Sequence, residues 1–439
     1  HYECILREID NTIKRVLKKL YYPMNLRANY SKRIRLSLAF SIVAMTVCAQ
    51  SIWNAEHLEQ VKKSLNQPAY NATYLNLLKQ ADKALNAHYL SVMMKDKTPP
   101  SGDKHDYLSQ ARYFWPDPTK PDGKPYISRD GVSNPELDKL DRNRLGEMAN
   151  NVTTLALAWY FSGKEQYALK ATKQIRVWFL DKKTCMNPHL KYAQVAPGHN
   201  NDLGRCYGVI DTYSLVEMLD AVQLLEKSRS FTSKDSEQLK KWFGQLLDWI
   251  LTSEQGKEEA SRPNNHSTAY DAQAIAFALY TGNHKVAERI LREVPKKRVF
   301  KQIEPDGKQP EELRRTLAFG YSEFNLQHLI DIATMGEKAH VPVLSVSSAD
   351  GRSIYKAADF LKPYLGKGVK EWPYKQISEW NGKQQELCKD LYRLYLLDST
   401  RTDYLKAYQQ FRKSNPKDLF NLLFLSLIHI SEPTRRTPI

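Results

Sequence analysis

The sequence predicts an all-α fold, an α/α barrel or toroid in which a ring of helical hairpins surrounds a central cleft. Helical stretches recur in pairs separated by short breaks, and few segments show the alternating pattern of a β-strand. The chain has 439 residues, 42% of them hydrophobic, which is enough for a large buried core. An irregular array of helices is the alternative architecture.

The first clear hairpin begins with 151–161, an apolar run rich in Ala and Leu. Ser162-Gly163 is a good helix stop, because glycine readily adopts the left-handed conformation that ends many helices. A second helix is expected from Glu165 to about Leu180. These two helices form the first predicted hairpin.

The same plan recurs downstream, where a helix at 268–280 is stopped by Thr281-Gly282-Asn283 and followed by a helix at 284–292. Asn150-Asn151 and Asn264-Asn265 precede the first helix of their respective hairpins, and Asn is a favoured N-cap. Further helical pairs are expected at 213–226 with 233–252, 317–335 with 352–362, and 384–397 with 402–413.

Two long stretches lack helical patterns, 99–136 and 184–207. Both mix aromatic residues with His, Asn and Arg. Loops of this length in a compact domain are usually functional. We therefore expect them to line the cleft.

The formal net charge of the chain is +16. The two ends carry seven of these charges, which leaves +9 for 50–425. A basic body favours an anionic partner, and the dispersed Lys and Arg residues argue against nucleic acid. The 8 Trp and 25 Tyr residues suit stacking on sugar rings, although most aromatic residues fill cores.

The N-terminal region contains a predicted secretory signal peptide at 24–49. A basic segment after Met24 leads into the apolar run 36–47, which is too short to span a bilayer, and we expect cleavage after Ala49. The protein is therefore expected to be secreted or periplasmic, without stable membrane insertion after signal removal. Residues 1–23 resemble translated upstream sequence and 426–439 a non-native tail, which leaves 50–425 as the folded domain.

The predicted mature chain has three cysteines, Cys185, Cys206 and Cys388. This odd, sparse set forms neither a disulfide framework nor a CxxC metal pair. Cys185–Cys206 is the candidate bridge that the sequence leaves open.

One set of polar residues could carry chemistry. Asn265 and His266 open a helix, beside the positive end of its dipole. Downstream, if 311–324 is a single helix, Arg314 and Tyr321 lie seven residues apart and share a face. This spacing favours Arg314 over Arg315, unless Gly320 breaks the helix.

Cleavage of a uronate polymer by β-elimination needs such a set. The sugar carboxylate must be neutralised by Asn, His or Arg, a base must remove the C5 proton, and an acid must protonate O4. Tyr can serve as base and acid if nearby positive charge lowers its pKa from about 10. Capping, a solvated arginine face and core packing are the alternative explanations of these residues.

Several segments resemble the alginate lyase family in sequence and order: SGDKHDY with FWPDP, NPHLKYAQ, NNHSTAYD, RRTLAFGY and WPYKQISEW. The resemblance covers about Ser101 to Glu379. It implies an α/α barrel, β-elimination of an anionic polysaccharide (alginate or glucuronan), and no metal or other cofactor. The family's Asn-His motif falls on Asn265 and His266, and its R-x6-Y spacing matches Arg314 and Tyr321.

We therefore expect Tyr321 to be the base and also the acid. Asn265 and His266, with Arg314 or Arg315, would neutralise the carboxylate. If the C5 proton lies on the opposite ring face, His266 would be the base and Tyr321 the acid. Candidates for lining sugar subsites are His105, Tyr107, Trp115, Asn151, His199, Asn201, Arg205 and Tyr270.

Two other functions are compatible with the sequence. A helical-barrel glycoside hydrolase acting on unsaturated uronides would need catalytic carboxylates, for which Asp106, Asp202 and Asp271 are available. A non-catalytic periplasmic glycan-binding protein would explain the charge and the aromatic residues. It would not explain why Asn265, His266, an arginine and Tyr321 occur together.

Overall fold

The computed structural model describes residues 51–429, all within the compact unit Ala49–Ile439. The predicted upstream segment 1–23 and signal peptide 24–49 lie outside the described residues, as does 430–439 of the predicted tail. No helix between residues 51 and 429 is long and apolar enough to cross a membrane.

Most of the described chain is helical, as predicted. The helices of seven residues or more are α3 (Ala55–Lys63), α4 (Pro68–Asn86), α5 (Asp141–Ser162), α6 (Glu165–Ile175), α7 (Ser214–Leu225), α8 (Ser233–Thr252), α9 (Glu254–Ala260), α10 (Asn265–Tyr280), α11 (His284–Val294), α14 (Ala318–Lys338), α15 (Ile354–Leu361), α16 (Trp380–Leu397) and α17 (Thr402–Phe411). Short helices are α12 (Phe300–Gln302), α13 (Pro310–Leu313) and α18 (Phe420–Leu423).

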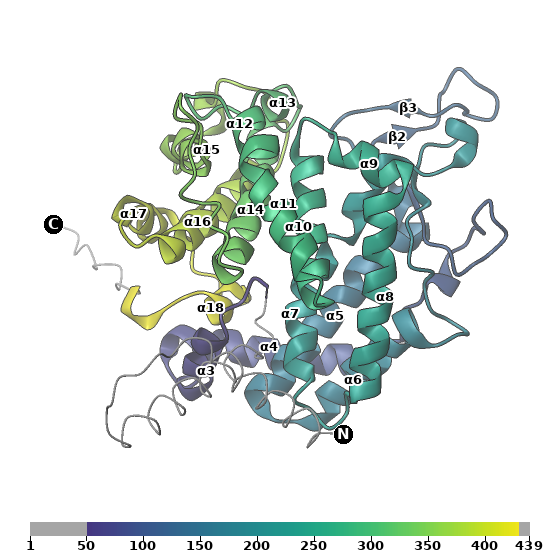
Figure 1. Cartoon of the computed structure of the whole chain (residues 1–439), viewed down its shortest axis with the longest axis horizontal. Coiled ribbons are helices and arrows are strands. Elements are labelled where there is room, and N and C mark those ends of the chain that lie inside the picture. The colour runs from purple at the N-terminus through teal and green to yellow at the C-terminus, as the bar shows by residue number, and fades with distance from the viewer. Residues whose placement is uncertain (1–50, 430–439) are drawn as a thin grey trace, which may run out of the picture. The chain divides into compact units, whose positions relative to one another are not determined.

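The helices form two layers (Figure 1). The inner helices α5, α7, α10, α14 and α16 pack against one another in chain order. The outer helices α6, α11, α15 and α17 each pack on the inner helix that precedes them, and α8 covers α10. This arrangement of hairpins confirms the predicted α/α barrel.

Burial follows the layers. Nearly every residue of α10 is buried, and its many alanines allow close packing on α14. The outer helix α11 instead buries only one stripe, which contains Ile290 and Leu291. At the end of α5, Gly163 adopts φ 71°, which confirms the predicted stop.

The predicted start of the first hairpin was wrong. Helix α5 begins at Asp141, so Asn150 and Asn151 lie inside it. The polar turn before them continues the helix, because tertiary packing outweighs the preference of Asn for caps. Asn264 does cap α10, and its side chain accepts a hydrogen bond from the backbone N–H of His266 at 3.4 Å.

The long non-helical stretches contain four short strands. Strand β1 (Leu108–Gln110) pairs in parallel with β4 (Tyr192–Val195), and β2 (Phe114–Trp115) pairs antiparallel with β3 (Ile127–Ser128). Figure 1 shows β2 and β3 at the same end of the helical array as α9 and α13.

A 3₁₀ helix, η6 (Cys206–Thr212), lies directly against β4. A Cβ at Gly208 would stand 2.4 Å from the Ala193 side chain, so only glycine permits this approach. This contact places the η6 side chains beside the β4 side chains. The three cysteines 185, 206 and 388 are free thiols, so no Cys185–Cys206 bridge forms.

Candidate active site

A cavity of about 730 Å³ opens between the inner helices and the two long loops. Its walls come from the loop around β2, from α5, β4 and η6, and from the N-termini of α10 and α14. The polar and aromatic residues that line it include Arg112, Tyr113, Phe114, Asp130, Arg142, Glu147, Gln194, Arg205, Tyr207, Asp211, Tyr213, Asn264, Asn265, His266, Arg315 and Tyr321.

Tyr321 lies in the first turn of α14, and its hydroxyl faces two partners. The hydroxyl of Tyr113 is 2.8 Å away, and Nη2 of Arg315 donates to the Tyr321 oxygen at 3.0 Å. Burial raises the pKa of Tyr321 above its usual range, and Tyr113 adds to this, while Arg315 lowers it. Arg315 therefore acts in the predicted direction, but the net pKa is raised, and Tyr321 is a protonated phenol at neutral pH.

The predicted preference for Arg314 over Arg315 was wrong in geometry. Residues 311–324 do not form one helix: α13 ends at Leu313 and α14 begins at Ala318. The seven-residue spacing therefore does not bring Arg314 to the face of Tyr321. The Arg314 side chain is 71% exposed and pairs with Glu311 at 2.5 Å, whereas Arg315 lines the cavity.

Asp130 holds Arg315 in place. Its Oδ1 accepts from Nη2 of Arg315 at 2.5 Å and its Oδ2 from Nε at 3.3 Å. Oδ2 also accepts from the backbone N–H and the hydroxyl of Thr316, at 3.2 and 3.0 Å. Such a paired contact fixes the plane of the guanidinium group.

The segment 372–380, WPYKQISEW, supports the start of α14. The Oε1 atom of Gln376 accepts from the backbone N–H groups of Phe319 and Gly320, at 3.0 and 3.3 Å. These donors have no partner within the helix, because they belong to its first turn. Gln376 thus caps the turn that carries Tyr321.

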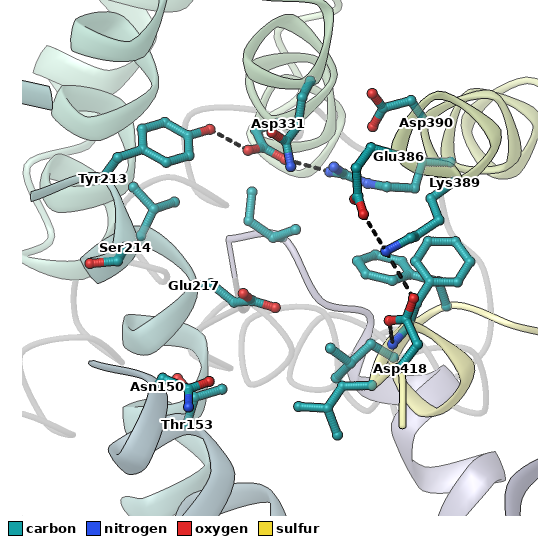
Figure 2. A pocket seen from close by; sticks show the side chains of 18 of the residues that line it. Asn150, Thr153, Tyr213, Ser214, Glu217, Asp331, Glu386, Lys389, Asp390 and Asp418 are labelled. Atoms are coloured by element: carbon teal, nitrogen blue, oxygen red, sulfur yellow. Dashed lines mark hydrogen bonds and ion pairs between the residues drawn. The ribbon is translucent and has the colours of Figure 1, made fainter. Parts of the chain in front are cut away.

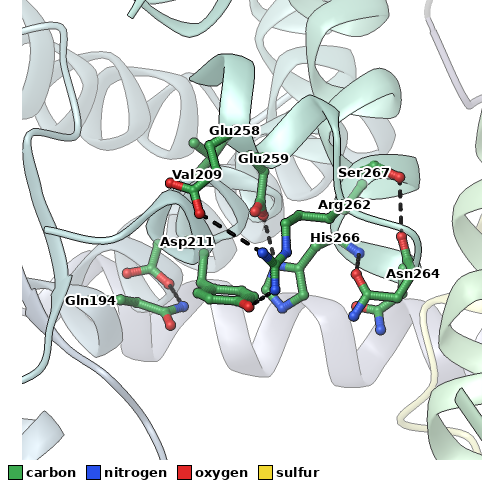
Figure 3. Close-up of polar contacts among 12 residues, drawn as sticks. Gln194, Val209, Asp211, Glu258, Glu259, Arg262, Asn264, His266 and Ser267 are labelled. Carbon is green, nitrogen blue, oxygen red and sulfur yellow. Dashed lines mark hydrogen bonds and ion pairs between the residues drawn. The ribbon is translucent and has the colours of Figure 1, made fainter. Parts of the chain in front are cut away.

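His266 is oriented by a buried carboxylate (Figure 3). Its Nδ1 lies 2.6 Å from Oε1 of Glu259, which is fully buried at the end of α9. A carboxylate beside Nδ1 keeps a proton on that nitrogen, so Nε2 is the ring nitrogen that can gain or lose one. Tyr207 packs edge-on against the imidazole, with ring centroids 4.8 Å apart.

Asn265 is held by Glu312 of α13. The backbone N–H of Asn265 donates to Oε1 of Glu312 at 2.6 Å, and its side-chain Nδ2 donates to Oε2 at 2.7 Å. Both residues are 1% exposed. Burial raises the pKa of Glu312 to about 7, against the lowering effects of Asn265, His266 and Arg315.

Asp211 of η6 holds together the side chains of the cavity wall that β4 and η6 form. It accepts from Ser109 at 2.5 Å, from Tyr107 at 3.1 Å and from Nε2 of Gln194 at 2.9 Å, and Arg142 lies 3.4 Å away. Gln194 has φ 51°, a conformation that costs free energy for a residue with a side chain. Its contacts offset that cost and direct the amide to the cavity.

Of the predicted subsite residues, Arg205 lines this cavity. Its guanidinium stacks on Phe114 and Tyr207, with 4.7 and 4.4 Å from its carbon to the ring centroids. The cavity wall does not include His105, Tyr107, Trp115, Asn151, His199, Asn201 or Tyr270.

Several of these residues stabilise the loops around the cavity through hydrogen bonds to backbone carbonyls. His105 contacts the carbonyl of Cys185 at 2.6 Å, and Trp115 donates to the carbonyl of Val132 at 2.9 Å. His199 contacts the carbonyl of Tyr126 at 2.7 Å, beside the exposed, left-handed Asn201. The local sequence could not separate them from residues that face the cavity.

Tyr107 donates to Asp211, as described above, and the remaining two residues lie on inner helices. Asn151 of α5 lines a separate cavity of about 310 Å³. The hydroxyl of Tyr270 on α10 donates to the carbonyl of Ile250 at 3.2 Å, so it is used in packing. Neither reaches the cavity that contains Tyr321.

A second cavity, of about 470 Å³, adjoins the first and shares Gly146, Tyr213, Ser214 and Phe324 with it (Figure 2). Its charged residues are mainly acidic: Glu217, Asp331, Glu386, Asp390 and Asp418, against Lys389 and Arg393. The Tyr321 cavity instead presents four arginines against three acids. A polyanion is therefore favoured in the Tyr321 cavity.

The aspartates considered for a hydrolase do not line the Tyr321 cavity. Asp271 is buried in an ion pair with Arg298, at 2.7 Å. Asp106 accepts from Ser101 and Asn187, and Asp202 accepts from the backbone N–H of Gly198. Each of the three has a structural role instead.

A helical barrel whose cavity combines Tyr, His, Asn and Arg side chains defines a class of protein, the polysaccharide lyases that act by β-elimination. The comparisons with known proteins agree. The sequence matches the alginate lyase family over residues 91–372. No curated protein matches it.

Solved structures extend the comparison. A crystal structure of an alginate lyase from Bacteroides ovatus is 50% identical, with a TM-score of 0.84, and the match covers 86% of this chain and 99% of that one. Alginate lyase A1-III, as a histidine-to-alanine variant complexed with a tetrasaccharide, is 15% identical, with a TM-score of 0.50 over 81% of this chain and 95% of that one. The same enzyme from Sphingomonas species A1 gives 15% identity and a TM-score of 0.48, over 81% and 96%.

The chain belongs to the alginate lyase family. It is a polysaccharide lyase, an enzyme that breaks a glycosidic carbon–oxygen bond by elimination.

Proposed function

We propose that this enzyme cleaves a 1,4-linked polyuronate, either alginate, through its mannuronate-containing stretches, or glucuronan, and leaves 4,5-unsaturated uronate ends. The observation that carries the proposal is the Tyr321 hydroxyl, 3.0 Å from Nη2 of Arg315, in the cavity that His266 and Asn265 also line. The 50% identical alginate lyase from Bacteroides ovatus supports alginate as the first substrate to test.

In the proposed reaction, the substrate carboxylate binds near Arg315, Asn265 and His266. Their positive charge and N–H groups stabilise the negative charge that develops when the C5 proton leaves. The electron pair of the C5–H bond forms the C4–C5 double bond, and the C4–O4 bond breaks with its electrons on O4. A proton on O4 then completes the new chain end.

Tyr321 transfers a proton in both versions of this mechanism, either as base and acid together or as acid alone. In mannuronate and glucuronate, the C5 proton and O4 leave from the same face of the ring, so one residue can be both base and acid. As base, Tyr321 must first lose its own proton to solvent, and Arg315 stabilises the resulting phenolate. The phenolate then takes the C5 proton and passes it to O4. In guluronate the two groups leave from opposite faces, and His266 would be the base and Tyr321 the acid.

The test is ultraviolet absorbance of the unsaturated product, measured separately with polymannuronate, polyguluronate and glucuronan. Activity on polymannuronate or glucuronan supports Tyr321 as both base and acid. Cleavage of polyguluronate with equal efficiency would contradict the single-residue version. If a folded sample forms no unsaturated product from any of the three, the proposed substrates are wrong.

We also propose that the enzyme is exported by the signal at 24–49 and works in the periplasm or outside the cell. A polymeric anionic substrate is met there. Expression of the full chain in a bacterial host and N-terminal sequencing of the exported product test this. A mature N-terminus at Gln50 is expected. An intact segment 24–49 on active enzyme in the cytoplasm would overturn the proposal.

A further inference from the structure

The side-chain amide of Asn265 is satisfied at one end only. Its Nδ2 donates to Glu312, but its Oδ1 is buried without a hydrogen-bond partner. A buried acceptor without a partner is unfavourable unless a ligand satisfies it. The expected ligand here is a sugar carboxylate, which also accepts hydrogen bonds and so cannot satisfy Oδ1.

An amide can turn by half a rotation and exchange its two ends, provided that its partners allow it. A charged Glu312 only accepts hydrogen bonds, so it requires Nδ2 on its own side. A protonated Glu312 can still accept from the Asn265 backbone N–H on one oxygen. Its other oxygen then donates to Oδ1 of the turned amide, and both Nδ2 hydrogens are free for the substrate.

We propose that Glu312 is a positioning residue that works as a neutral carboxylic acid and turns the Asn265 amide so that its NH₂ faces the substrate carboxylate. This inference rests on the proposed role of Asn265. A neutral Glu312 has a second benefit, because a charged carboxylate in contact with Asn265 would repel the substrate and offset the charge of Arg315.

The surroundings of Glu312 favour this neutral form near neutral pH. The charged and titratable groups that act on it are His266 of α10, which pairs with Glu259 of α9, and Arg315 after α13, which in turn contacts Tyr321 of α14. Burial outweighs the hydrogen bonds from Asn265 and the effects of His266 and Arg315, and raises the pKa of Glu312 to about 7. A bound polyanion adds negative charge and raises this pKa further.

Glu312→Gln tests the inference, because a glutamine has the same donor and acceptor pattern as the protonated acid. Its carbonyl accepts from the Asn265 backbone and its NH₂ donates to Oδ1. Rates on the best wild-type polyuronate are measured from acidic to alkaline pH. We expect the variant to keep kcat/KM within about threefold of wild type below neutral pH and to lose part of the wild-type decline above it.

Glu311→Gln is the matched control, since Glu311 lies on the same short helix but pairs with the exposed Arg314. It should leave the pH profile unchanged. Glu312→Ala, which cannot donate to Oδ1, should lower kcat/KM about tenfold or more at all pH values. A structural role alone would lower activity in both Glu312 variants without moving the pH profile.

A second readout is proton uptake on binding of a short oligouronate, measured by calorimetry in buffers of different ionisation enthalpy. Wild-type enzyme should take up a fraction of a proton near neutral pH, and Glu312→Gln should take up less. The inference is overturned if the folded Gln variant is as inactive as the Ala variant, or if its pH profile and proton uptake match wild type. If wild-type enzyme cuts none of the polyuronates, it is the proposed function that has failed.

Discussion

Arg315 contacts Tyr321 in two ways: its Nη2 lies 3.0 Å from the hydroxyl, and its guanidinium carbon lies 3.9 Å from the ring centroid. The same cation therefore interacts with the reacting oxygen and with the face of the ring. Asp130 fixes the guanidinium from the other side, so the contact is set before substrate arrives. Burial keeps Tyr321 protonated at rest, and Arg315 stabilises its phenolate when the proton moves.

Replacing Tyr321 with Phe should abolish formation of unsaturated product. The phenol oxygen is the proton-transfer group in both versions of the mechanism, so we expect kcat to fall by about 10²–10⁴-fold. Circular dichroism and the unfolding temperature should stay close to wild type. Tyr355→Phe is the control, because its hydroxyl bonds Asp398 outside the cavity. Turnover retained by Tyr321→Phe would contradict the assignment.

The two neighbouring arginines should behave differently. Arg315→Ala removes the cation beside Tyr321 and should lower kcat/KM by about 10²-fold or more. Arg314→Ala removes an exposed pair with Glu311 and should leave activity within about twofold, because surface ion pairs contribute little. Initial rates on one polyuronate compare the two variants. Equal losses would contradict the assignment of Arg315, and not Arg314, to the site of Tyr321.

Glu259 should affect kcat indirectly, because it orients His266. Glu259→Gln replaces a charge-assisted hydrogen bond to Nδ1 with a neutral one, so the imidazole is held and polarised less strongly. We expect kcat to fall about tenfold with an unchanged fold. Glu258→Gln is the control, because Glu258 is 58% exposed and faces Arg262 instead. If both variants keep wild-type rates, Glu259 does not orient a working histidine.

The barrel could be predicted from the sequence because its signals are local. Gly163 ends α5, and Thr281-Gly282-Asn283 separates α10 from α11, so a helix stop and the following start lie within a few residues. Apolar content then marks the inner helices. The start of α5 could not be placed, since a polar first turn has no distinctive sequence pattern.

The site could be predicted only in part, because its geometry depends on partners distant in sequence. Asp130 lies 185 residues from Arg315, and Tyr113 lies 208 residues from Tyr321. Neither contact produces a pattern in the local sequence from which it could be predicted. The first turn of α14 is likewise capped by a distant residue, Gln376, which lies 57 residues from Phe319.

Asp271→Asn separates structural from catalytic aspartates. It leaves Arg298 as a buried charge without its ionised partner, and we expect a loss of about 3–5 kcal/mol in the free energy of unfolding. The folded fraction should keep its kcat, because Asp271 does not line the Tyr321 cavity. Urea unfolding and initial rates below the unfolding transition measure the two effects. A loss of kcat in fully folded protein would instead support a hydrolase mechanism that uses catalytic carboxylates.

Acid should weaken the contact between α8 and the π-helical turn η4 (Arg176–Leu180), which follows α6. Asp235 accepts from Arg176 at 2.7 Å and belongs to the capping box of α8. Burial opposes its ionisation, but the hydrogen bonds from Arg176 and Thr232 outweigh it and lower the pKa of Asp235 to about 2. A pKa that is lower in the folded state stabilises the protein above the unfolded value of about 3.9, and this stabilisation is lost as pH falls from about 4 to about 2.

The Arg176 side chain is 39% exposed and solvent screens the pair, so we expect Asp235 to contribute about 1 kcal/mol at neutral pH. Asp235→Asn should therefore lower the free energy of unfolding by about that amount at pH 7 and make it less sensitive to pH below about 4. Glu237→Gln on the exposed side of α8 is the control and should change neither quantity. Urea unfolding followed by circular dichroism at several pH values gives both quantities. If the Asn variant and wild type lose stability in parallel between pH 4 and 2, another carboxylate is responsible for the acid sensitivity.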